Sequence, residues 1–423
     1  MGFLQKGDIA RTFFLYGRAY GGFSCFSKSA IRWPLNNVSQ MSAGARTNIA
    51  AGQKKSFSTS CQPTNHLKTM ASPKGQGMIT MKIGVLVGGG DAPGLNAAIK
   101  SAVSKANELG FDVIGIKSGW AGLLDVDTQP LSSDTVEEIH SRGGVILYTS
   151  RTNPFKIENG PKKVIENVKR LKLDALIVMG GEDTLGVAEK LHEMGLPIVG
   201  VPKTIDNDLS GTDYSIGFDT AVAIATDAID RLRTTAEAHH RIVILEVMGR
   251  NTGWIALYAG LAGGANLTLI PEVPLGLNQV YDLLKKRHKM GKAYSIIVVA
   301  EGAKLLKEKE QILMASEEKD EFGHPRLGGI SHVLEDLIIG NTGLEVRSVV
   351  LGHLQRGGSP TAFDRILAMR LAAKAVELIA GKEFGKMASF QACEVTSVPL
   401  KEGMKERKSV PPELYEMAKT FFR

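Results

Sequence analysis

Residues 82–94 read Lys-Ile-Gly-Val-Leu-Val-Gly-Gly-Gly-Asp-Ala-Pro-Gly, and a helical pattern follows from Leu95 to about Leu109. A strand, a glycine-rich turn and a helix in this order favour phosphate binding, because glycines let backbone N–H groups approach an anion at the helix N-terminus. The turn matches neither Gly-x-Gly-x-x-Gly nor a P-loop, so a plain tight turn is the alternative. A second strand at 113–116 begins a βαβ series and predicts a parallel sheet.

Two further segments place charged groups where a strand ends. Residues 143–155 are expected to form a strand ending at Arg151, and an exposed surface arginine is the alternative. A buried strand at 175–179 runs into Gly-Gly-Glu-Asp-Thr at 180–184, before a helix from about 185 to 194. Helix capping would account for the aspartate and the threonine. It does not account for the doubled glycine or for Glu182, whose carboxylate is suited to Mg²⁺.

The stretch 202–208, Pro-Lys-Thr-Ile-Asp-Asn-Asp, follows an apolar run at 197–201 that is typical of a buried strand. Asp206 and Asp208 can converge in a loop on a metal ion or on a hydroxyl to be deprotonated. A solvated acidic turn is the alternative, since Asn and Asp are ordinary turn residues. The carboxyl ends of parallel strands meet at one edge of a sheet, so these groups together predict a cleft for a magnesium-bound polyphosphate.

A second set of motifs lies beyond residue 238. Strands are expected at 242–247, at 296–300 and at 348–351, and each runs into polar residues. Each arginine here would by itself be a surface charge, and His353 a structural histidine. Together, the arginines can bind a second phosphorylated molecule through paired hydrogen bonds; they are Arg241, Arg250, Arg347 and Arg356. The charged segment 303–328 is expected to be a solvated loop or helix.

Length and charge narrow the class of protein. A chain of 423 residues exceeds the usual size of one core, so two domains are expected. No apolar run approaches the roughly 18 residues that span a bilayer, which argues against a membrane partner. Residues 1–70 hold nine cations against Asp8, so the rest of the chain is nearly neutral although the net charge is +7. The basic charge therefore lies outside the folded body, which argues against nucleic acid as a partner.

The basic head has its own alternatives. Residues 1–70 are rich in Ser and Arg and nearly free of acid, as mitochondrial and other organellar transit peptides are. A disordered extension, or translation that starts at Met70, Met78 or Met81, would also explain them. Of the three cysteines only Cys393 lies in the body, which excludes a disulfide framework there and suits a reducing compartment.

Six motifs give the body, over essentially all of residues 81–400, a resemblance to the phosphofructokinase family. They are Gly-Gly-Asp-Ala-Pro-Gly-Leu-Asn (89–96), Thr-Ile-Asp-Asn-Asp (204–208), Gly-Phe-Asp-Thr-Ala (217–221), Glu-Val-Met-Gly-Arg (246–250), Val-Ala-Glu-Gly (299–302) and Leu-Gly-His-Leu-Gln-Arg-Gly-Gly-Ser-Pro (351–360). The resemblance implies reversible transfer of a phosphoryl group to the 1-hydroxyl of fructose 6-phosphate, with Mg²⁺ as cofactor.

The resemblance also implies roles for individual residues. Asp206 would be the general base, acting with Asp183, Lys203 and Arg250. The donor would be held by Gly90, Arg151, Asp183, Thr184 and Lys203, and the metal by Glu182. The sugar phosphate would be held by Thr204, Ile205, Asp206, Asp208, Arg241, Met248, Gly249, Arg250, Glu301, Arg347, His353, Leu354, Gln355 and Arg356. In the family, the residues matching Arg241 and Arg347 reach in from a neighbouring subunit, which implies a homodimer or homotetramer.

The donor is where the sequence departs from the ATP-using pattern. Those enzymes usually read Gly-Gly-Asp-Gly-Ser and Pro-Gly-Thr-Ile-Asp-Asn-Asp, where this chain has Gly-Gly-Glu-Asp-Thr and Pro-Lys-Thr-Ile-Asp-Asn-Asp. Asp183 puts a carboxylate about where the α-phosphate of ATP would lie, and like charges repel there. Lys203 adds a cation that suits a short, highly charged donor. Both changes resemble the pyrophosphate-dependent branch, and ATP is the alternative donor.

The expected fold class is α/β, with two Rossmann-like parallel-sheet domains after an N-terminal extension at 1–80. The donor domain is expected at 81–217 and 355–405, and the fructose 6-phosphate domain at 218–354 and 406–423. The resemblance implies a cytoplasmic glycolytic enzyme. A Rossmann dehydrogenase is disfavoured by the missing dinucleotide motif, and a non-catalytic regulatory subunit by the presence of Asp206, Arg250 and Arg356.

Overall fold

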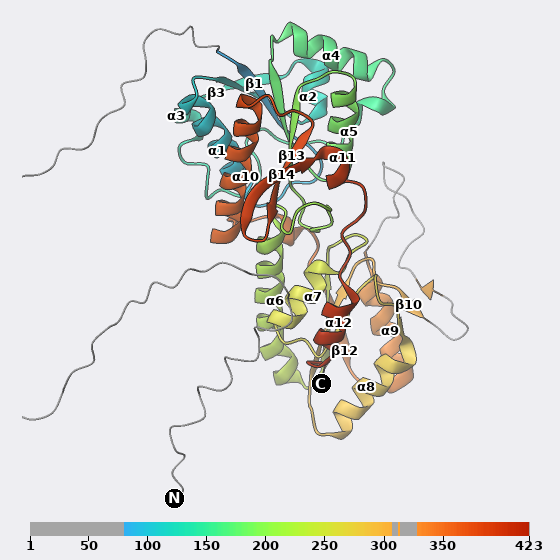
Figure 1. Ribbon diagram of the computed structural model, residues 1–423. Helices are drawn as coiled ribbons and strands as arrows, with labels where there is room; N and C mark the ends of the chain where they lie inside the picture. Colours follow the sequence, from blue (N-terminus) through green and yellow to red (C-terminus); the bar gives the residue numbers. More distant parts are fainter. Residues whose placement is uncertain (1–79, 307–311, 314–327, 423) are drawn as a thin grey trace, which may run out of the picture. The chain divides into compact units, whose positions relative to one another are not determined.

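The computed structural model describes residues 80–306, 312–313 and 328–422, shown as coloured ribbon in Figure 1. The predicted head, residues 1–70, lies outside the described residues. Among the described residues, no helix is both long and apolar enough to cross a bilayer.

The first half of the fold is built on a seven-stranded sheet in the order β14-β13-β5-β4-β1-β2-β3. Strands β2, β1, β4, β5 and β13 run parallel, whereas the two edge strands β3 and β14 run antiparallel to their neighbours. The strands are β1 (Lys82–Val87), β2 (Asp112–Ile116), β3 (Thr128–Leu131), β4 (Ala175–Gly180), β5 (Ile198–Pro202), β13 (Lys386–Gln391) and β14 (Glu394–Pro399). We call these strands and their helices the seven-stranded half.

Helices cover both faces of this sheet, as buried parallel strands require. They are α1 (Leu95–Glu108), α2 (Trp120–Asp125), α3 (Ser133–Val136), η1 (Pro154–Lys156), α4 (Gly160–Arg170), α5 (Glu182–Glu193), α10 (Ala362–Ala380) and α11 (Leu400–Gly403). Helices α1 and α10 pack side by side on one face (Figure 1), although more than 250 residues separate them in the sequence. The C-terminal part of the chain therefore completes a half that begins at β1.

The second half is built on a four-stranded, all-parallel sheet in the order β12-β6-β9-β7. We call it the four-stranded half. Its strands are β6 (Ile242–Val247), β7 (Leu267–Leu269), β9 (Ser295–Ala300) and β12 (Val346–Val350). Its helices are α6 (Phe218–His239), α7 (Trp254–Ala262), α8 (Leu277–Lys289), α9 (Ile330–Thr342), η2 (Gly352–Arg356) and α12 (Pro412–Lys419). A small sheet of β8 (Leu275–Gly276), β10 (Leu305–Leu306) and β11 (Ile312–Leu313) adjoins them in sequence.

The alternation of side chains along each strand divides the core into layers. In β1, Val85 and Val87 face a core shared with residues of the four-stranded half, whereas Leu86 faces the opposite layer. In β6, Val243 and Leu245 belong to the same shared core and Ile244 to a third layer. This is the two-residue period of a strand. This continuous apolar layer joins the two halves, so it holds their sheets, and the edges at which the strands end, in place.

The junction between the halves is held by a buried carboxylate. Asp364, near the start of α10, is fully buried and accepts hydrogen bonds from the Gly217 and Thr220 backbone N–H groups at 2.9 and 2.8 Å and from the Thr220 hydroxyl at 2.6 Å. Burial raises the pKa of Asp364 to about 6. A negative charge at the first turn of α6 is favourable because the helix dipole is positive there.

The fold class predicted from the sequence is confirmed: it is α/β with parallel sheets, and strands β1 and β6 have the expected bounds. The strand expected at 143–155 is wrong, since residues 143–153 form an irregular segment and the next two begin η1. Its backbone takes positive φ at Gly144 and at Tyr148, 68° and 55°, which no strand allows. The predicted domain boundaries stay a prediction.

Two helix predictions also need correction. Helix α5 begins at Glu182 rather than at about 185, so Glu182 and Asp183 lie within its first turn. The segment 303–328 was expected to be a loop or helix, but its described part contains the short strands β10 and β11. The remainder of that segment lies outside the described residues.

Candidate active site

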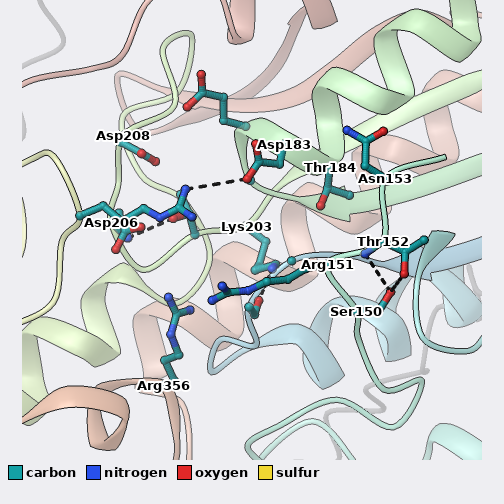
Figure 2. Close-up of a pocket in the computed structure, with 16 residues that line it drawn as sticks. Ser150, Arg151, Thr152, Asn153, Asp183, Thr184, Lys203, Asp206, Asp208 and Arg356 are labelled. Atoms are coloured by element: carbon teal, nitrogen blue, oxygen red, sulfur yellow. Dashed lines mark hydrogen bonds and ion pairs between the residues drawn. The ribbon is translucent and has the colours of Figure 1, made fainter. Parts of the chain in front are cut away.

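A pocket opens at the carboxyl ends of β1, β4 and β5, where Figure 2 shows most of its polar lining. It brings together eleven of the residues predicted from the sequence. They are Gly90, Arg151, Glu182, Asp183, Thr184, Lys203, Thr204, Asp206, Asp208, Arg250 and Arg356. All but Arg250 and Arg356 come from the segments that follow strands of the seven-stranded half or lie beside them.

The two aspartates converge because Asn207 between them adopts a left-handed conformation with φ of 52°. Asparagine tolerates this conformation better than most residues. Its side chain is tied down on both sides: Oδ1 accepts from the Ser215 N–H at 3.1 Å, and Nδ2 donates to the Asp213 carbonyl at 3.2 Å. The loop is thus held so that Asp206 and Asp208 both line the pocket, and it is no solvated acidic turn.

Asp206 and Asp208 differ in their surroundings. Asp206 is buried, at 5% exposed, and its Oδ1 has no hydrogen-bond partner among the described residues. Burial, followed by the charge of Asp206, raises the pKa of Asp208 to about 7. Asp208 therefore holds a proton more readily than an ordinary aspartate does. An unpartnered buried oxygen on Asp206 is available to accept a hydrogen bond from a bound molecule.

Lys203 is enclosed beneath the glycine turn. Its Nζ donates to the Gly88 carbonyl at 2.8 Å and also to the Gly90 carbonyl. Burial, followed by the charge of Arg356, lowers the pKa of Lys203 to about 7. The ammonium therefore holds the turn in place from below, and an anion in the pocket would stabilise its charge.

The first turn of α5 carries two acids into the pocket. Gly181 is the N-cap of α5, and no side chain forms a capping hydrogen bond, so capping does not explain Asp183 or Thr184. An Asp183 oxygen lies 3.8 Å from a guanidinium nitrogen of Arg250, which follows the end of β6. The structure thus bridges the two halves across the pocket with an ion pair.

Thr184 is 5% exposed and is enclosed by glycines. A Cβ at Gly88 would lie 2.6 Å from Thr184 Cγ2, and one at Gly180 would lie 2.4 Å from Thr184 Cβ. Only glycine therefore lets the ends of β1 and β4 close around this side chain. At Gly90 a Cβ would lie 2.6 Å from an Arg356 guanidinium nitrogen, so a side chain there would displace the end of Arg356.

Arg151 reaches the pocket from an irregular segment instead of from a strand end. The segment is fixed beside the glycine turn, because the Gly89 N–H donates to the Ser150 carbonyl at 2.9 Å and the Thr149 hydroxyl donates to the Gly89 carbonyl at 2.6 Å. Arg151 therefore lines the pocket from a different local structure than expected, and its binding role stays a prediction.

The turn after β6 positions Arg250. Gly249 has a φ of 145°, which side chains rarely adopt, and Arg250 follows with a φ of 50°. The Glu301 carboxylate accepts from both backbone N–H groups, at 3.3 and 2.9 Å. Burial raises the pKa of Glu301 to about 7. Glu301 therefore supports the Arg250 turn from the end of β9, and it is not among the residues lining the pocket.

Several predicted residues lie outside the pocket lining. Met248 and Gly249 precede Arg250, Ile205 is fully buried, and Gln355 is fully buried with an unpartnered Oε1 among the described residues. His353 and Leu354 are exposed on η2. Arg241 and Arg347 contact the same Glu345 oxygen, at 2.9 and 3.2 Å. The binding roles predicted for these residues stay predictions.

Sequence reasoning missed part of the lining. The pocket also includes Gly89, Ser150, Thr152, Asn153 and Gly181. The run of polar residues around Arg151 was the available signal for Ser150, Thr152 and Asn153. It carried little weight because the segment was expected to be a strand, in which alternate side chains would point away.

A glycine turn, a buried lysine, several arginines and paired carboxylates at one edge of an α/β sheet are typical of an enzyme that transfers phosphoryl groups. The comparisons with known proteins agree. Residues 82–379 match the family described as phosphofructokinase, and the chain belongs to that family.

The relatives include enzymes named for pyrophosphate as donor and enzymes named for ATP. The pyrophosphate–fructose 6-phosphate 1-phosphotransferase of Amycolatopsis methanolica is 54% identical over 344 residues, 81% of this chain and all of the relative. The ATP-dependent 6-phosphofructokinase 3 of Streptomyces coelicolor is 47% identical over 341 residues, 80% of this chain and 99% of the relative. The solved phosphofructokinase of Saccharomyces cerevisiae has a TM-score of 0.66 at 31% identity, covering 77% of this chain and 45% of the yeast chain.

Proposed function

We propose that the protein transfers a phosphoryl group from pyrophosphate to the 1-hydroxyl of D-fructose 6-phosphate, giving fructose 1,6-bisphosphate and phosphate in a reversible reaction. Family membership and the names of relatives at 50–54% identity support this reaction. The observation that carries the choice of donor is Asp183 in the pocket at the start of α5.

The charges at the donor end favour a short anion. A carboxylate on the first turn of α5 opposes any phosphate placed against it, whereas most helix N-termini attract one. At roughly 4 Å, two like charges repel by several kcal/mol in a partly buried site. Lys203, by contrast, presents a buried cation beside the glycine turn. In this proposal pyrophosphate contacts Lys203 and ends there, whereas the longer phosphate chain of ATP would bring a further phosphate against Asp183.

The acceptor hydroxyl would be activated by Asp206. Its buried Oδ1 is unpartnered within the part of the chain that the structure describes, so it can take the hydroxyl proton as the new phosphate ester bond forms. Asp208, with its raised pKa, limits the negative charge that would otherwise oppose the incoming donor. Arg250 and Arg356 line the same pocket and can neutralise the charge that spreads over the transferring group.

The residues present fit a magnesium ion bound together with substrate. Among the described residues, no group of three or more His, Cys, Asp or Glu side chains could hold a metal by itself. Mg²⁺ in phosphoryl-transfer sites is usually bound by one or two carboxylates plus substrate phosphates. Glu182, whose side chain is 53% exposed at the pocket, is the carboxylate that we assign to it. When bound, the ion would neutralise donor oxygens.

The sugar phosphate would need a second subunit. Arg241 precedes β6 and Arg250 follows it closely, so the six residues of β6 separate them by roughly 20 Å. Neither Arg241 nor Arg347 lines the pocket of its own chain. Next to Arg347, the edge strand β12 exposes the apolar side chains of Val349 and Val350. We assign this edge to an interface with a second copy, in a homodimer or homotetramer that would supply both arginines to a neighbouring site.

We assign the donor to the seven-stranded half and the sugar phosphate to the four-stranded half, with domains at 81–217 plus 355–405 and at 218–354 plus 406–423. The cytoplasm is the compartment in which glycolytic sugar phosphates would meet this enzyme. The organelle alternative depends on residues 1–70, outside the described residues, and none of the relatives supports it.

A paired donor assay on the full-length protein tests the proposal. Wild-type protein should form fructose 1,6-bisphosphate with magnesium pyrophosphate and not with magnesium ATP. Asp183→Gly should gain turnover with ATP, with an increase in kcat/KM of about tenfold or more, because a repulsion of at least 1.4 kcal/mol is removed. Asp183→Asn, which removes the charge but keeps the size, separates repulsion from crowding. Robust wild-type turnover with ATP alone would overturn the choice of donor.

A further inference from the structure

The residues 407–410, which we call the C-terminal strap, run between the two halves beside the pocket. On one side the Lys408 N–H donates to the Asp208 carbonyl at 2.8 Å, and Arg407 forms an isolated antiparallel bridge with Leu209. On the other side the Trp254 indole N–H donates to the Lys408 carbonyl at 2.7 Å. The strap is thereby joined to the loop that contains Asp206 and Asp208 and to the start of α7.

Further contacts hold the strap in register. Lys408 Nζ donates to the Thr212 and Asp213 carbonyls, each at 2.8 Å, and lies 5.4 Å from the centre of the Trp254 ring. The Val410 N–H donates to a Glu272 carboxylate oxygen at 3.0 Å, and the same oxygen accepts from the Gly253 N–H. The strap is held on one side by backbone groups of residues 208–213 and on the other by the Trp254 and Glu272 side chains, which places Arg407 in a defined position.

Arg407 directs its guanidinium toward the acids of the pocket. Its Nη2 lies 3.6 Å from a Glu182 carboxylate oxygen, and its charge acts to lower the pKa of Asp208 against the effect of burial. The Arg407 and Glu182 side chains are 37% and 53% exposed. An ion pair this exposed adds little to stability. Its effect is therefore on where the Glu182 carboxylate points and on the local charge.

We propose that Arg407 is a positioning residue of the donor site, which holds the Glu182 carboxylate in the orientation that receives magnesium pyrophosphate. This inference rests on the proposed function, because Glu182 matters in this way only if the donor arrives with its metal. Partners that orient a metal-binding carboxylate usually change metal affinity about 10–100-fold when they are removed. Arg407 is 225 residues from Glu182 in the sequence, so no local motif points to it.

The test compares three variants of the full-length protein. Arg407→Gln removes the charge and keeps hydrogen-bonding capacity, and Arg407→Lys restores a charge at that position. Lys405→Gln removes a charge from an exposed side chain two residues earlier and serves as the matched control. Calorimetric titration with magnesium pyrophosphate, without sugar phosphate, measures donor binding independently of turnover. Steady-state kinetics then separate KM for pyrophosphate from KM for fructose 6-phosphate, and thermal unfolding reports stability.

We expect Arg407→Gln to weaken donor binding about 10–100-fold with KM for the sugar unchanged. Arg407→Lys should recover most of that loss, and Lys405→Gln should bind like wild type. Equal donor affinity in Arg407→Gln and Lys405→Gln would overturn the inference. So would a failed rescue by lysine, or a loss of sugar and donor affinity together with a lowered Tm. Failure of the wild-type protein to bind or use pyrophosphate would instead sink the proposed function, and the inference with it.

Discussion

The two halves of the molecule present their charged strand ends differently. At the seven-stranded half, the segments after β1, β4 and β5 converge with Arg151 on one pocket within a single chain. At the four-stranded half, Arg250 reaches that pocket, whereas Arg241 and Arg347 turn to Glu345. Under the proposed function, a single chain assembles the donor site, and a neighbouring subunit would supply the cations of the sugar-phosphate site. Binding of the donor therefore tests the residues of a single chain, and binding of fructose 6-phosphate tests the assembly of subunits.

At the seven-stranded half, the largest effect is expected from Asp206→Asn. Removing the carboxylate that takes the hydroxyl proton should lower kcat by about 10²–10⁴-fold, because general base help is of that size. Calorimetric binding of pyrophosphate should stay within about threefold of wild type, since the amide keeps the shape of the side chain. A variant that retains kcat would move the base elsewhere, with Asp208 the next carboxyl to test.

The proposed sharing of the sugar-phosphate site between subunits predicts that two impaired variants can restore each other's activity. Arg347→Ala should raise KM for fructose 6-phosphate by about 10–100-fold and leave KM for pyrophosphate unchanged, since it removes a charge-assisted contact to phosphate. Refolding or subunit exchange of an equal mixture with Asp206→Asn should restore about a quarter of wild-type sites, because mixed dimers have one intact site. Absence of any recovery after proven exchange would show that each chain completes its own sugar site, which removes the difference between the halves.

A smaller effect is expected from pH on the donor side. Lys203 has its pKa lowered to about 7, so in the free enzyme the ammonium is present below that pH and is lost as the pH rises. The kcat/KM for pyrophosphate should fall about tenfold per pH unit above this value, since kcat/KM reports the free enzyme. Lys203→Arg should move that limb upward, because a guanidinium stays charged. If the limb is unchanged in this variant, it belongs to the donor or to another group.

The smallest effect concerns the junction that both halves share. Asp364→Ala leaves three donors at the start of α6 without their acceptor, which should lower the free energy of unfolding by about 1–3 kcal/mol. Asp219→Ala, which removes one bond to Thr361 from a half-buried carboxylate, is the matched control and should cost less than about 1 kcal/mol. Chemical denaturation measures both. Equal costs would mean that Asp364 does not join the halves energetically.

The sequence predicted most where apolar runs are unambiguous. Strands β1 and β6 and the start of α1 were placed correctly because each run has clear polar boundaries. The family resemblance and the fold class are confirmed, and the converging acids of 206–208 follow from a turn residue that the motif contains. The strand predicted at 143–155 is wrong because its apolar residues lie in a loop, and periodicity in the sequence does not reveal the positive φ angles of that loop.

The remainder depended on contacts between distant segments. Arg407 approaches Glu182 only because the strap is hydrogen-bonded to Asp208 and to Trp254. The capping alternative for Asp183 could be excluded only once Gly181 was seen as the N-cap. The separation of Arg241 from the pocket likewise follows from the direction of β6, and the residue types do not predict that direction.

Strands β4 and β5 are neighbours, with Gly180 opposite Pro202, so the next residues along each strand lie at adjacent positions of the pocket rim. Asp183 and Lys203 occur there, and neither side chain belongs to the apolar layers that hold the sheet together. If these two residues select the donor, as proposed, the donor could change through substitutions at the pocket rim that leave the scaffold intact. Relatives named for pyrophosphate and for ATP share 54% and 47% of their residues with this chain, so overall identity alone does not separate the two donors.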